Sequence, residues 1–519
     1  ALRLPDTDDA MRLQQWRDWL GGQGFADLSQ HRLADGLASH WSRLPDLIPG
    51  GLIASLTPLV GRHTAELGAV ILWPGLLFAV ALILIGRIAR VQRASAPTAI
   101  VIGALAFPAT GLFLPGRIDH HGLQLVLLLA MVAALLHRRG TASGVGVGLS
   151  AVASLVIGLE TAPFVALACA LVMFGWVAER EGSQRHLGAL ALTLAVALAV
   201  AAAVFAPDAW AWSACDGFTR TAWRAELIGA GALVALALLG QTVVGRGPRL
   251  LLAGAIGGLA AVAIALVAAT CLNPYGNVDP ALAARWLANV GEAQPLFAAP
   301  RATAIGQCGL MLAGIAAGGW ACRRTRDPGW AILLLFQLTA AAITVAQLRG
   351  AWAGAILAAP ALAMLVAAAR TRGPLALAAA WLASAGITYP LFAQAALPAP
   401  RESGPPACTG PAAFAALAAL PPGRVAAPID FGAWGIAATR HRFLAAPYHR
   451  NNAGNAAAFA ILDGPAPRAL AAARQARVDY LAVCDAQPGW WRNALAPIGR
   501  GGGLTVYAFP RLPQSAARP

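Results

Sequence analysis

The sequence contains no lysine, and charged residues make up only 12% of its 519 positions. A soluble domain of ordinary composition carries about twice that charged fraction. All 38 basic residues are therefore arginine, and with 23 acidic residues they give a net charge of +15. A basic balance can indicate nucleic-acid binding. Here the arginines stand in short loops between apolar runs, which indicates membrane topology and argues against a nucleic-acid partner.

Two kinds of motif are also absent. The seven cysteines form no Cys-x-x-Cys spacing, which argues against a cysteine-based metal site. No Rossmann-type glycine loop occurs, and a reaction outside the cytoplasm needs none. Cys408 and Cys484 both fall in the C-terminal tail, where they can pair in an oxidising compartment. Cys215 and Cys271 fall in predicted outer loops.

Long apolar runs recur through the first three quarters of the chain, for example Leu67–Gly86 and Gly122–Leu136. A helix needs about 20 residues to cross the hydrocarbon core. Lipid leaves no other way to satisfy the backbone of so many runs. We predict twelve spanning helices, over residues 66–86, 96–114, 120–136, 142–158, 161–178, 187–206, 227–244, 250–270, 302–320, 329–346, 349–369 and 375–396.

The loops between these helices alternate in character. One set is rich in arginine: Arg87/Arg90/Arg93, Arg138/Arg139, Arg180/Arg185, Arg246/Arg249, Arg323/Arg324/Arg326 and Arg370/Arg372. The other set comprises Pro115–His121, Leu159–Thr161, Pro207–Glu226, Cys271–Arg301 and Leu348–Gly350. Short arginine-rich loops stay cytoplasmic. The second set and both ends of the chain are therefore predicted to face outward.

Polar segments frame the predicted bundle of residues 66–396. Residues 1–65 are expected to form a first external loop. The tail, residues 397–519, begins with the proline-rich linker Leu397–Pro411 and then alternates strand-like runs with alanine-rich helical stretches. This pattern predicts a small α/β domain. Because the chain opens in a polar segment without a signal peptide, we expect a processed start or one further helix upstream, which makes thirteen.

Two clusters near predicted outer segments suggest a metal site. Asp6, Asp8 and Asp9 repel one another unless a cation lies among them, and Mg²⁺ or Mn²⁺ prefers such oxygens. A solvated helix start capped by aspartate fits the same residues. Asp119, His120 and His121 stand at the outer mouth of a helix, where Asp-x-His spacing can bring a carboxylate and an imidazole to one metal. Ionisable groups at a membrane mouth usually have a function, although a helix cap with interfacial histidines is the structural alternative.

Three further positions suggest ligand binding. Glu292 lies in a long outer loop, where a lone glutamate is usually solvated. Arg349 starts a helix at the outer face, where arginine suits phosphate recognition or snorkels to the interface. In the tail, Asp430 follows a strand-like run, and a polar stretch follows the next one. Both resemble a ligand-facing edge, with turn chemistry as the alternative. The polar stretch holds Tyr448, His449, Asn451 and Asn452.

Taken in order, these motifs resemble those of the catalytic subunit of oligosaccharyltransferases, membrane enzymes of protein N-glycosylation with the GT-C architecture. That family has thirteen transmembrane helices followed by a non-cytoplasmic C-terminal domain. The resemblance covers nearly the whole chain in order and spacing. It implies a mainly α fold, a polytopic transmembrane helical bundle with a small C-terminal α/β domain outside the cytoplasm.

The resemblance also implies roles for the acidic motifs. Asp6-Thr-Asp-Asp-Ala-Met-Arg-Leu is similar to the family's first acidic motif, so Asp6 is expected to bind the metal, with Asp8 as its alternative and Asp9 beside it. Gly116-Arg-Ile-Asp-His-His is similar to the second acidic motif in its archaeal form. It implies that Asp119 and His121 are metal ligands, with His120 adjacent.

Other local matches imply the remaining roles. Gly291-Glu-Ala-Gln-Pro resembles the short motif of the fifth external loop, which places Glu292 at the catalytic centre. Leu348-Arg-Gly resembles the segment whose arginine holds the donor phosphates, hence Arg349. The Asp430 segment and its asparagine-rich follower resemble the family's acceptor-binding region. This chain departs from the pattern at Ala427-Pro428-Ile429, where the family has the tryptophan pair that reads the acceptor sequon. The acceptor therefore stays open between protein, lipid and glycan.

The expected activity is metal-dependent, inverting transfer of a glycan from a polyprenyl phosphate or pyrophosphate donor to a protein or envelope-glycan acceptor. Mn²⁺ or Mg²⁺ is the expected cofactor, and the active site is expected to face the periplasm from a bacterial inner membrane. One alternative is a GT-C enzyme that moves a single sugar from a lipid monophosphate. Another is a transporter of lipid-linked glycans. Transporters usually place their charges at the membrane midplane, whereas here the acids crowd the outer mouth.

Overall fold

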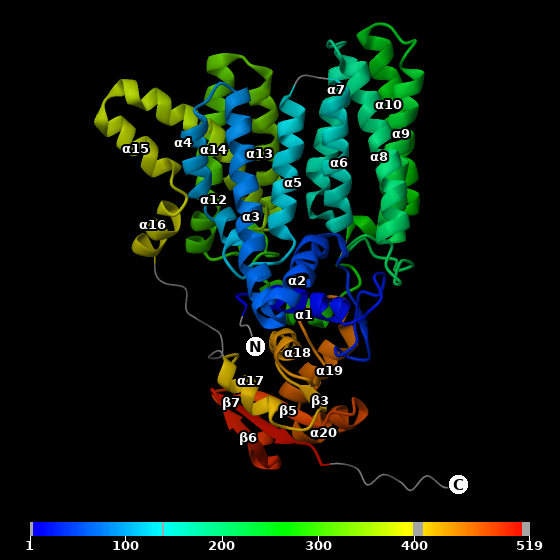
Figure 1. Cartoon of the computed structure of the whole chain (residues 1–519), viewed down its shortest axis with the longest axis vertical. Coiled ribbons are helices and arrows are strands. Elements are labelled where there is room, and N and C mark those ends of the chain that lie inside the picture. The colour runs from blue at the N-terminus through cyan, green and yellow to red at the C-terminus, as the bar shows by residue number, and fades with distance from the viewer. Residues whose placement is uncertain (1–3, 138–139, 274, 398–407, 511–519) are drawn as a thin grey trace. The chain divides into compact units, whose positions relative to one another are not determined.

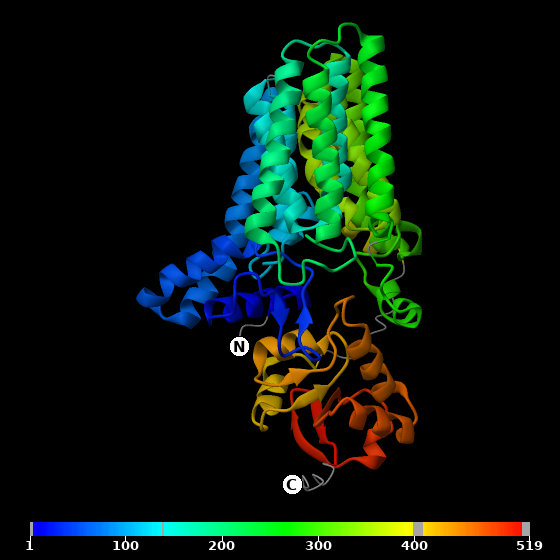
Figure 2. The same cartoon turned by 90° about the vertical axis from the view of Figure 1, so that its right-hand side faces the viewer.

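The computed structural model describes residues 4–137, 140–273, 275–397 and 408–510. The chain divides into two compact units (Figures 1 and 2). The larger unit comprises His40–Gly276 and Trp286–Pro400, and the smaller comprises Ala1–Ser39, Asn277–Arg285 and Arg401–Pro519. The predicted arginine pair Arg138/Arg139 and residues 398–407 of the predicted linker lie outside the described residues.

The larger unit is a helical bundle (Figure 1). Its helices are α2 (Leu47–Val60), α3 (Arg62–Val91), α4 (Ala96–Ala104), α5 (His121–Leu136), α6 (Thr141–Ile157), α7 (Ala162–Val177), α8 (Ser183–Phe205), α9 (Arg220–Leu239), α10 (Arg246–Val267), α12 (Arg301–Thr325), α13 (Pro328–Ala346), α14 (Gly350–Ala369), α15 (Pro374–Ser384) and α16 (Thr388–Ala396). Within the described residues, eight helical segments are long and apolar enough to cross a membrane, or nine if α15 and α16 count as one span. The chain is a multi-pass membrane protein, as predicted.

Two of the predicted spans are not single helices. In 96–114, helix α4 ends at Ala104, and a separate 3-10 turn, Ala109–Phe113, follows Pro108, whose ring cannot continue a helix. In 375–396, helices α15 and α16 meet at an angle of 88°. The bend lies at Gly386, where a Cβ atom would come within 2.5 Å of the Phe107 nitrogen. The prediction of one continuous helix was wrong in both segments.

Helix α14 forms the centre of the bundle, because small residues let its neighbours approach closely. Of the most apolar 18-residue stretch in Gly350–Arg372, 72% is buried. A Cβ atom added at Gly314 of α12 would lie 2.3 Å from the Ala358 Cβ, and one added at Gly354 would lie 2.3 Å from the Met311 sulfur. Such close contacts replace the hydrophobic effect between helices in lipid. They hold α14 firmly, and with it Arg349 at its start.

The smaller unit is an α/β domain, as predicted. Its five-stranded sheet has the order β4-β3-β5-β7-β6, in which β3 is parallel to β4 and β5, and β7 is antiparallel to β5 and β6. These strands are β3 (Arg424–Ala426), β4 (Arg442–Phe443), β5 (Tyr480–Cys484), β6 (Pro497–Gly501) and β7 (Leu504–Ala508). The sequence predicts strands over Arg424–Ile429, Phe443–Ala446, Tyr480–Cys484 and Leu504–Phe509. Strand β6 is not among them, because its exposed, glycine-containing sequence lacks the usual alternation. Strand β5 is buried at every residue and forms the centre of the sheet.

Short helices cover this sheet and bring the chain's first residues into the same unit. They are α1 (Thr7–Leu20), α11 (Pro280–Arg285), α17 (Pro411–Ala418), α18 (Phe431–Ala438), α19 (Asn452–Asp463), α20 (Ala466–Gln475) and α21 (Trp491–Ala494). Helix α1 packs against α18. A hairpin of β1 (Ser29–Gln30) and β2 (Leu37–Ala38) follows α1, and Leu33 forms a β-bridge to Phe443. The N-terminal segment is therefore part of the domain's core.

Cys408 and Cys484 form a disulfide across 76 residues, as the sequence allowed. We expect Cys408→Ala to lower the free energy of unfolding of this domain by about 2–4 kcal/mol, because the cross-link restricts the unfolded chain. Thermal unfolding of the purified protein, with and without a reductant, measures the effect. Cys169→Ala is the control, because Cys169 is a free cysteine. Unfolding of the Cys408→Ala variant at the wild-type temperature would contradict the prediction.

Candidate functional site

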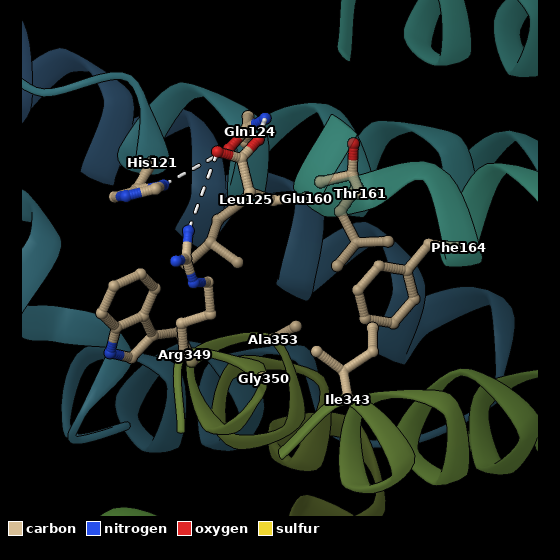
Figure 3. A pocket seen from close by; sticks show the side chains of 12 residues that line it. His121, Gln124, Leu125, Glu160, Thr161, Phe164, Ile343, Arg349, Gly350 and Ala353 are labelled. Atoms are coloured by element: carbon tan, nitrogen blue, oxygen red, sulfur yellow. Dashed lines mark hydrogen bonds and ion pairs between the residues drawn. The ribbon is translucent and has the colours of Figure 1, made fainter. Parts of the chain in front are cut away.

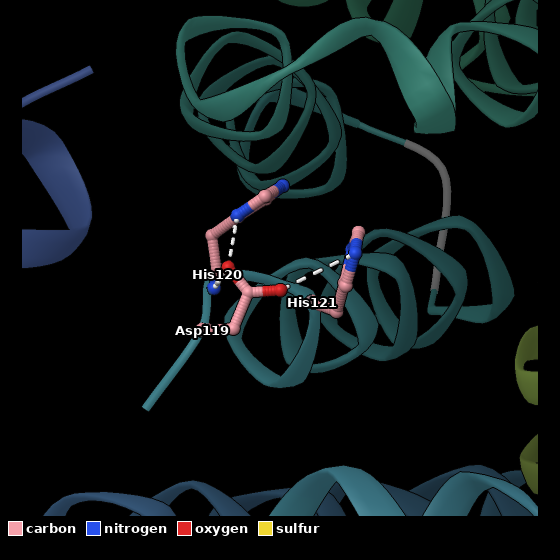
Figure 4. Close-up of side chains that lie close together, drawn as sticks. All are labelled: Asp119, His120 and His121. Carbon is pink, nitrogen blue, oxygen red and sulfur yellow. Dashed lines mark hydrogen bonds and ion pairs between the residues drawn. The ribbon is translucent and has the colours of Figure 1, made fainter. Parts of the chain in front are cut away.

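The second acidic motif forms a compact cluster at the start of α5 (Figure 4). The Asp119 Oδ1 atom accepts a hydrogen bond of 2.7 Å from the His120 backbone nitrogen and lies 2.6 Å from the ring atom Nδ1. The Asp119 Oδ2 atom lies 3.3 Å from Nε2 of His121. All three side chains are buried, and one ligand atom from each lies within 4.8 Å of the others. Carboxylates suit Mg²⁺ or Mn²⁺ and imidazoles suit Zn²⁺, so this donor set can hold a divalent ion.

Tryptophans pack against both histidine rings. The Trp352 ring centroid lies 5.0 Å from that of His121, and the Trp41 centroid lies 6.4 Å from that of His120. The imidazoles are therefore held between large side chains, so that their nitrogen atoms keep defined directions.

A second disulfide, Cys215–Cys271, joins two loops of the same unit.

Backbone hydrogen bonds bring Glu292 beside Arg349, although the two residues are 57 positions apart in the sequence. The Leu348 nitrogen donates to the Gln294 oxygen at 2.9 Å, and the Arg349 nitrogen donates to the Glu292 oxygen at 3.0 Å. The Glu292 Oε1 atom lies 3.9 Å from His121 Nε2 and 3.9 Å from Arg349 Nη2. The segments that were matched separately to the catalytic and phosphate-binding motifs thus meet at the Asp-His cluster.

Two residues that sequence reasoning missed contact the same groups. Glu160, in the 3-10 turn Leu159–Thr161, lies 3.6 Å from His120 Nε2 and 3.8 Å from Arg349 Nη1. The Tyr275 hydroxyl accepts a hydrogen bond of 3.0 Å from Arg349 Nη2. Burial raises the pKa of Tyr275 and keeps its phenol neutral. A carboxylate in a short loop between apolar helices was the available signal for Glu160. No sequence signal distinguished Tyr275.

Arg349 retains an unused donor. Its Nε atom is buried and has no hydrogen-bond partner within the described parts of the chain. A buried donor without a partner costs about 1–3 kcal/mol unless a ligand satisfies it. The guanidinium is permanently charged, so the group that fits this donor best is an anion.

A cavity opens beside the cluster (Figure 3). His121, Glu160 and Arg349 form its polar end. Its remaining walls are largely apolar and include Leu125, Leu128, Phe164, Ile343 and Ala353. The cavity therefore combines a charged end with apolar walls that suit hydrocarbon.

The first acidic motif belongs to the smaller unit. Asp6 is the N-cap of α1 and accepts a hydrogen bond of 3.3 Å from the Asp8 nitrogen. Asp9 is fully buried within this helix. The capping geometry agrees with the structural alternative considered for these residues. A role for Asp6 or Asp8 as a metal ligand stays a prediction.

The predicted acceptor-binding residues also lie in the smaller unit. Burial raises the pKa of Asp430, and the negative charge of Asp6 raises it further. Asn451 donates 3.1 Å hydrogen bonds to the Leu444 oxygen and to Asn455, and Asn452 donates to the Asn277 oxygen at 2.6 Å. These two amides therefore support the local fold. Tyr448 is buried and His449 is half-buried, and acceptor binding stays a prediction for the whole set.

The fold matches solved structures of an archaeal enzyme. The oligosaccharyltransferase AglB of Archaeoglobus fulgidus, in complex with an inhibitory peptide and a dolichol-phosphate, matches with a TM-score of 0.65 and 14% identity over 93% of this chain and 66% of that one. The Archaeoglobus fulgidus enzyme tethered to an acceptor peptide with an NVT sequon matches with a TM-score of 0.66 and 15% identity, over 93% and 65%. This chain has the oligosaccharyltransferase fold.

The same enzyme in complex with Zn and sulfate matches with a TM-score of 0.61 and 15% identity, over 93% of this chain and 64% of that one. Identities this low establish the shared fold and leave activity to be argued from the site. The chain spans just under two thirds of the length of these structures. No protein-family model matches the sequence, and no curated protein sequence matches it.

Proposed function

We propose that this chain is a metal-dependent glycosyltransferase that moves a glycan from a lipid-linked phosphate donor to an acceptor at the membrane surface. The observation that carries the proposal is the convergence of Asp119 and Glu292 on His121 and Arg349, which themselves line an apolar cavity. The Asp-His pair suits a divalent metal, Arg349 suits a phosphate, and the apolar walls suit a lipid chain. Complexes of the similar Archaeoglobus enzyme with dolichol-phosphate, an acceptor peptide and Zn with sulfate support this reading.

Each residue has a role in this reaction. Arg349, oriented by the Tyr275 hydroxyl, binds the donor phosphate. The acceptor atom forms a bond to the anomeric carbon as the bond from that carbon to the phosphate oxygen breaks, which inverts the configuration. Asp119 and His121 would hold a divalent ion, which would supply Lewis-acid neutralisation of the leaving phosphate. Glu292 orients the acceptor and takes its proton.

We also propose roles for residues of the smaller unit and an orientation of the chain in the membrane. Asp6 is proposed as a metal ligand, and Asp430, Tyr448, His449, Asn451 and Asn452 are proposed to bind the acceptor. The catalytic residues come from the loops opposite the arginine clusters, so the reaction takes place outside the cytoplasm. For a bacterial inner membrane this face is the periplasm. Mn²⁺ and Mg²⁺ are the proposed metals.

A donor with one phosphate is favoured over a pyrophosphate. Glu160 and Glu292 lie 3.8 and 3.9 Å from the Arg349 guanidinium and offset its charge. Arg349 is also the only permanent cation among the described residues that line the cavity. A single phosphodiester carries one negative charge and needs less compensation than a pyrophosphate.

Donor cleavage by the purified protein tests the function. We expect polyprenyl-phosphate glycans to be cleaved with Mn²⁺ and not with EDTA, and to be cleaved faster than the pyrophosphate form. Parallel reactions with a sequon peptide and with an envelope glycan identify the acceptor. Folded, Mn²⁺-binding protein that cleaves neither donor would contradict the proposal. Movement of an intact donor across liposomes would instead indicate a transporter.

A further inference from the structure

Gln124 lies one turn along α5 from His121 and is 3% exposed. Its Oε1 atom lies 3.4 Å from the Nδ1 atom of His121 (Figure 3). Its Nε2 atom lies 3.0 Å from the Glu160 Oε2 atom and 3.3 Å from the Gly158 oxygen. The amide therefore links the Asp-His cluster to Glu160, which also lies beside Arg349.

These contacts determine which way the amide points. An amide nitrogen only donates hydrogen bonds, and an amide oxygen only accepts them. The Gly158 carbonyl and the Glu160 carboxylate are both acceptors, so the nitrogen has to face them. The oxygen then faces His121, and only a protonated ring nitrogen can donate to it. The proton of a neutral His121 is therefore on Nδ1.

A glycine makes the arrangement of Glu160 and Gln124 possible. A Cβ atom added at Gly158 would lie 2.3 Å from the Glu160 Oε2 atom, which is the atom that accepts from Gln124. Gly158 has an extended backbone, with φ of 174°. The glycine is therefore needed because it leaves room for Glu160, and not because it adopts an unusual φ.

With its proton on Nδ1, His121 presents an unprotonated Nε2 atom to the rest of the site. That atom lies 3.3 Å from the Asp119 Oδ2 atom and 3.9 Å from the Glu292 Oε1 atom. Three acceptor atoms that face one another repel, and a cation among them removes the repulsion. Neutral imidazole nitrogen is also the form of histidine that binds metals.

We propose that Gln124 is a positioning residue for the metal site: held by Gly158 and Glu160, it fixes the tautomer of His121 that offers Nε2 to a divalent cation. The inference rests on the metal site of the proposed function and does not require glycan transfer. Partners that orient a ligating histidine typically change metal affinity by about 10–100-fold when they are removed. Gln124 would thus couple metal binding to Glu160 and Arg349.

The test compares Mn²⁺ binding by the purified full chain and its variants, measured by calorimetry and by Mn²⁺ paramagnetic resonance. Gln124→Met keeps the size of the side chain and removes both the carbonyl oxygen and the nitrogen of the amide. We expect the affinity for Mn²⁺ to fall by about 10–100-fold. Gln337→Met is the matched control. Gln337 is another buried helical glutamine, and it packs against Gly314 and Gly318 of α12. We expect this variant to bind Mn²⁺ as the wild type does.

A spectroscopic measurement separates tautomer control from a general structural role. In the metal-free protein labelled with ¹⁵N-histidine, the His121 signals should show a protonated Nδ1 and an unprotonated Nε2. Gln124→Met should shift this signature toward the other tautomer, and Gln337→Met should not. His121→Asn identifies the signals by their loss.

Gly158→Ala provides a second route if Gln124→Met does not fold. The added methyl group displaces Glu160 and leaves Gln124 in place, so we expect affinity for Mn²⁺ to fall several-fold. Wild-type affinity and an unchanged His121 signature in Gln124→Met would overturn the inference, as would an equal loss in Gln337→Met. Absence of Mn²⁺ binding by the wild type would overturn it as well. Absence of glycan transfer with Gln124-dependent Mn²⁺ binding intact would overturn only the proposed function.

Discussion

Asp119→Asn is expected to lower the rate of metal-dependent glycan transfer by about 10³-fold, which corresponds to about 4 kcal/mol of transition-state stabilisation. The carboxylate faces both histidines, with one oxygen 2.6 Å from His120 Nδ1 and the other 3.3 Å from His121 Nε2. Asparagine keeps the shape of the side chain but has no charge to offer a cation. Transfer rates and Mn²⁺ affinity should therefore fall together in this variant.

The matched control for this prediction is Asp327→Asn. Asp327 caps α13 and accepts a hydrogen bond of 2.8 Å from the Gly329 nitrogen. Asparagine caps a helix about as well as aspartate, so both stability and transfer should stay at wild-type levels. An Asp119→Asn protein that is folded and transfers glycan at the wild-type rate with Mn²⁺ would show that the metal site is wrongly assigned.

Arg349→Lys is expected to lower kcat/KM by about 10²-fold, or about 3 kcal/mol, chiefly by raising KM for the donor. The guanidinium donates to Tyr275 through one nitrogen and keeps Nε available for a ligand. An ammonium group is a single point charge and cannot occupy both positions. The carboxylates of Glu160 and Glu292 would also remain near the phosphate with less positive charge to balance them.

Two further variants test whether the effect on donor KM is specific to Arg349. Tyr275→Phe removes only the hydroxyl that accepts from Arg349, so its effect should be smaller, about 10-fold in donor KM. Arg372→Lys is the control, because this arginine is exposed in the turn that follows α14. Donor KM in Arg349→Lys equal to that of Arg372→Lys would remove Arg349 from the phosphate site.

The helices were predictable from the sequence wherever the apolar pattern of a segment alone decides its structure. Runs such as 120–136 and 329–346 became α5 and α13 with boundaries close to those expected. The failures came where a long-range contact overrides the local pattern. Gly386 donates a backbone hydrogen bond of 2.9 Å to the Leu105 oxygen, and this contact accompanies the bend between α15 and α16. Hydropathy contains no information about such a partner.

The functional site also contains features that the sequence predicts and features that only the tertiary structure shows. Asp119 and His121 lie two positions apart in the chain, so their proximity could be predicted from the spacing. Glu292 and Arg349 were identified as separate motifs, and their pairing depends on hydrogen bonds between two distant loops. Glu160, Gln124 and Tyr275 carry no motif of their own. They matter only because the tertiary fold brings their polar atoms beside His121 and Arg349.

The sequence by itself determined that the chain crosses the membrane repeatedly, that a small α/β domain follows, and which connecting loops contain ionisable residues. Those properties depend on the local cost of placing apolar and charged groups in lipid. Only the tertiary structure decided which of those residues meet, which nitrogen of His121 faces Asp119, and how Arg349 is flanked by Glu160 and Glu292. These features depend on distances of a few ångströms between separate loops, which the close packing of glycine and alanine around α14 sets.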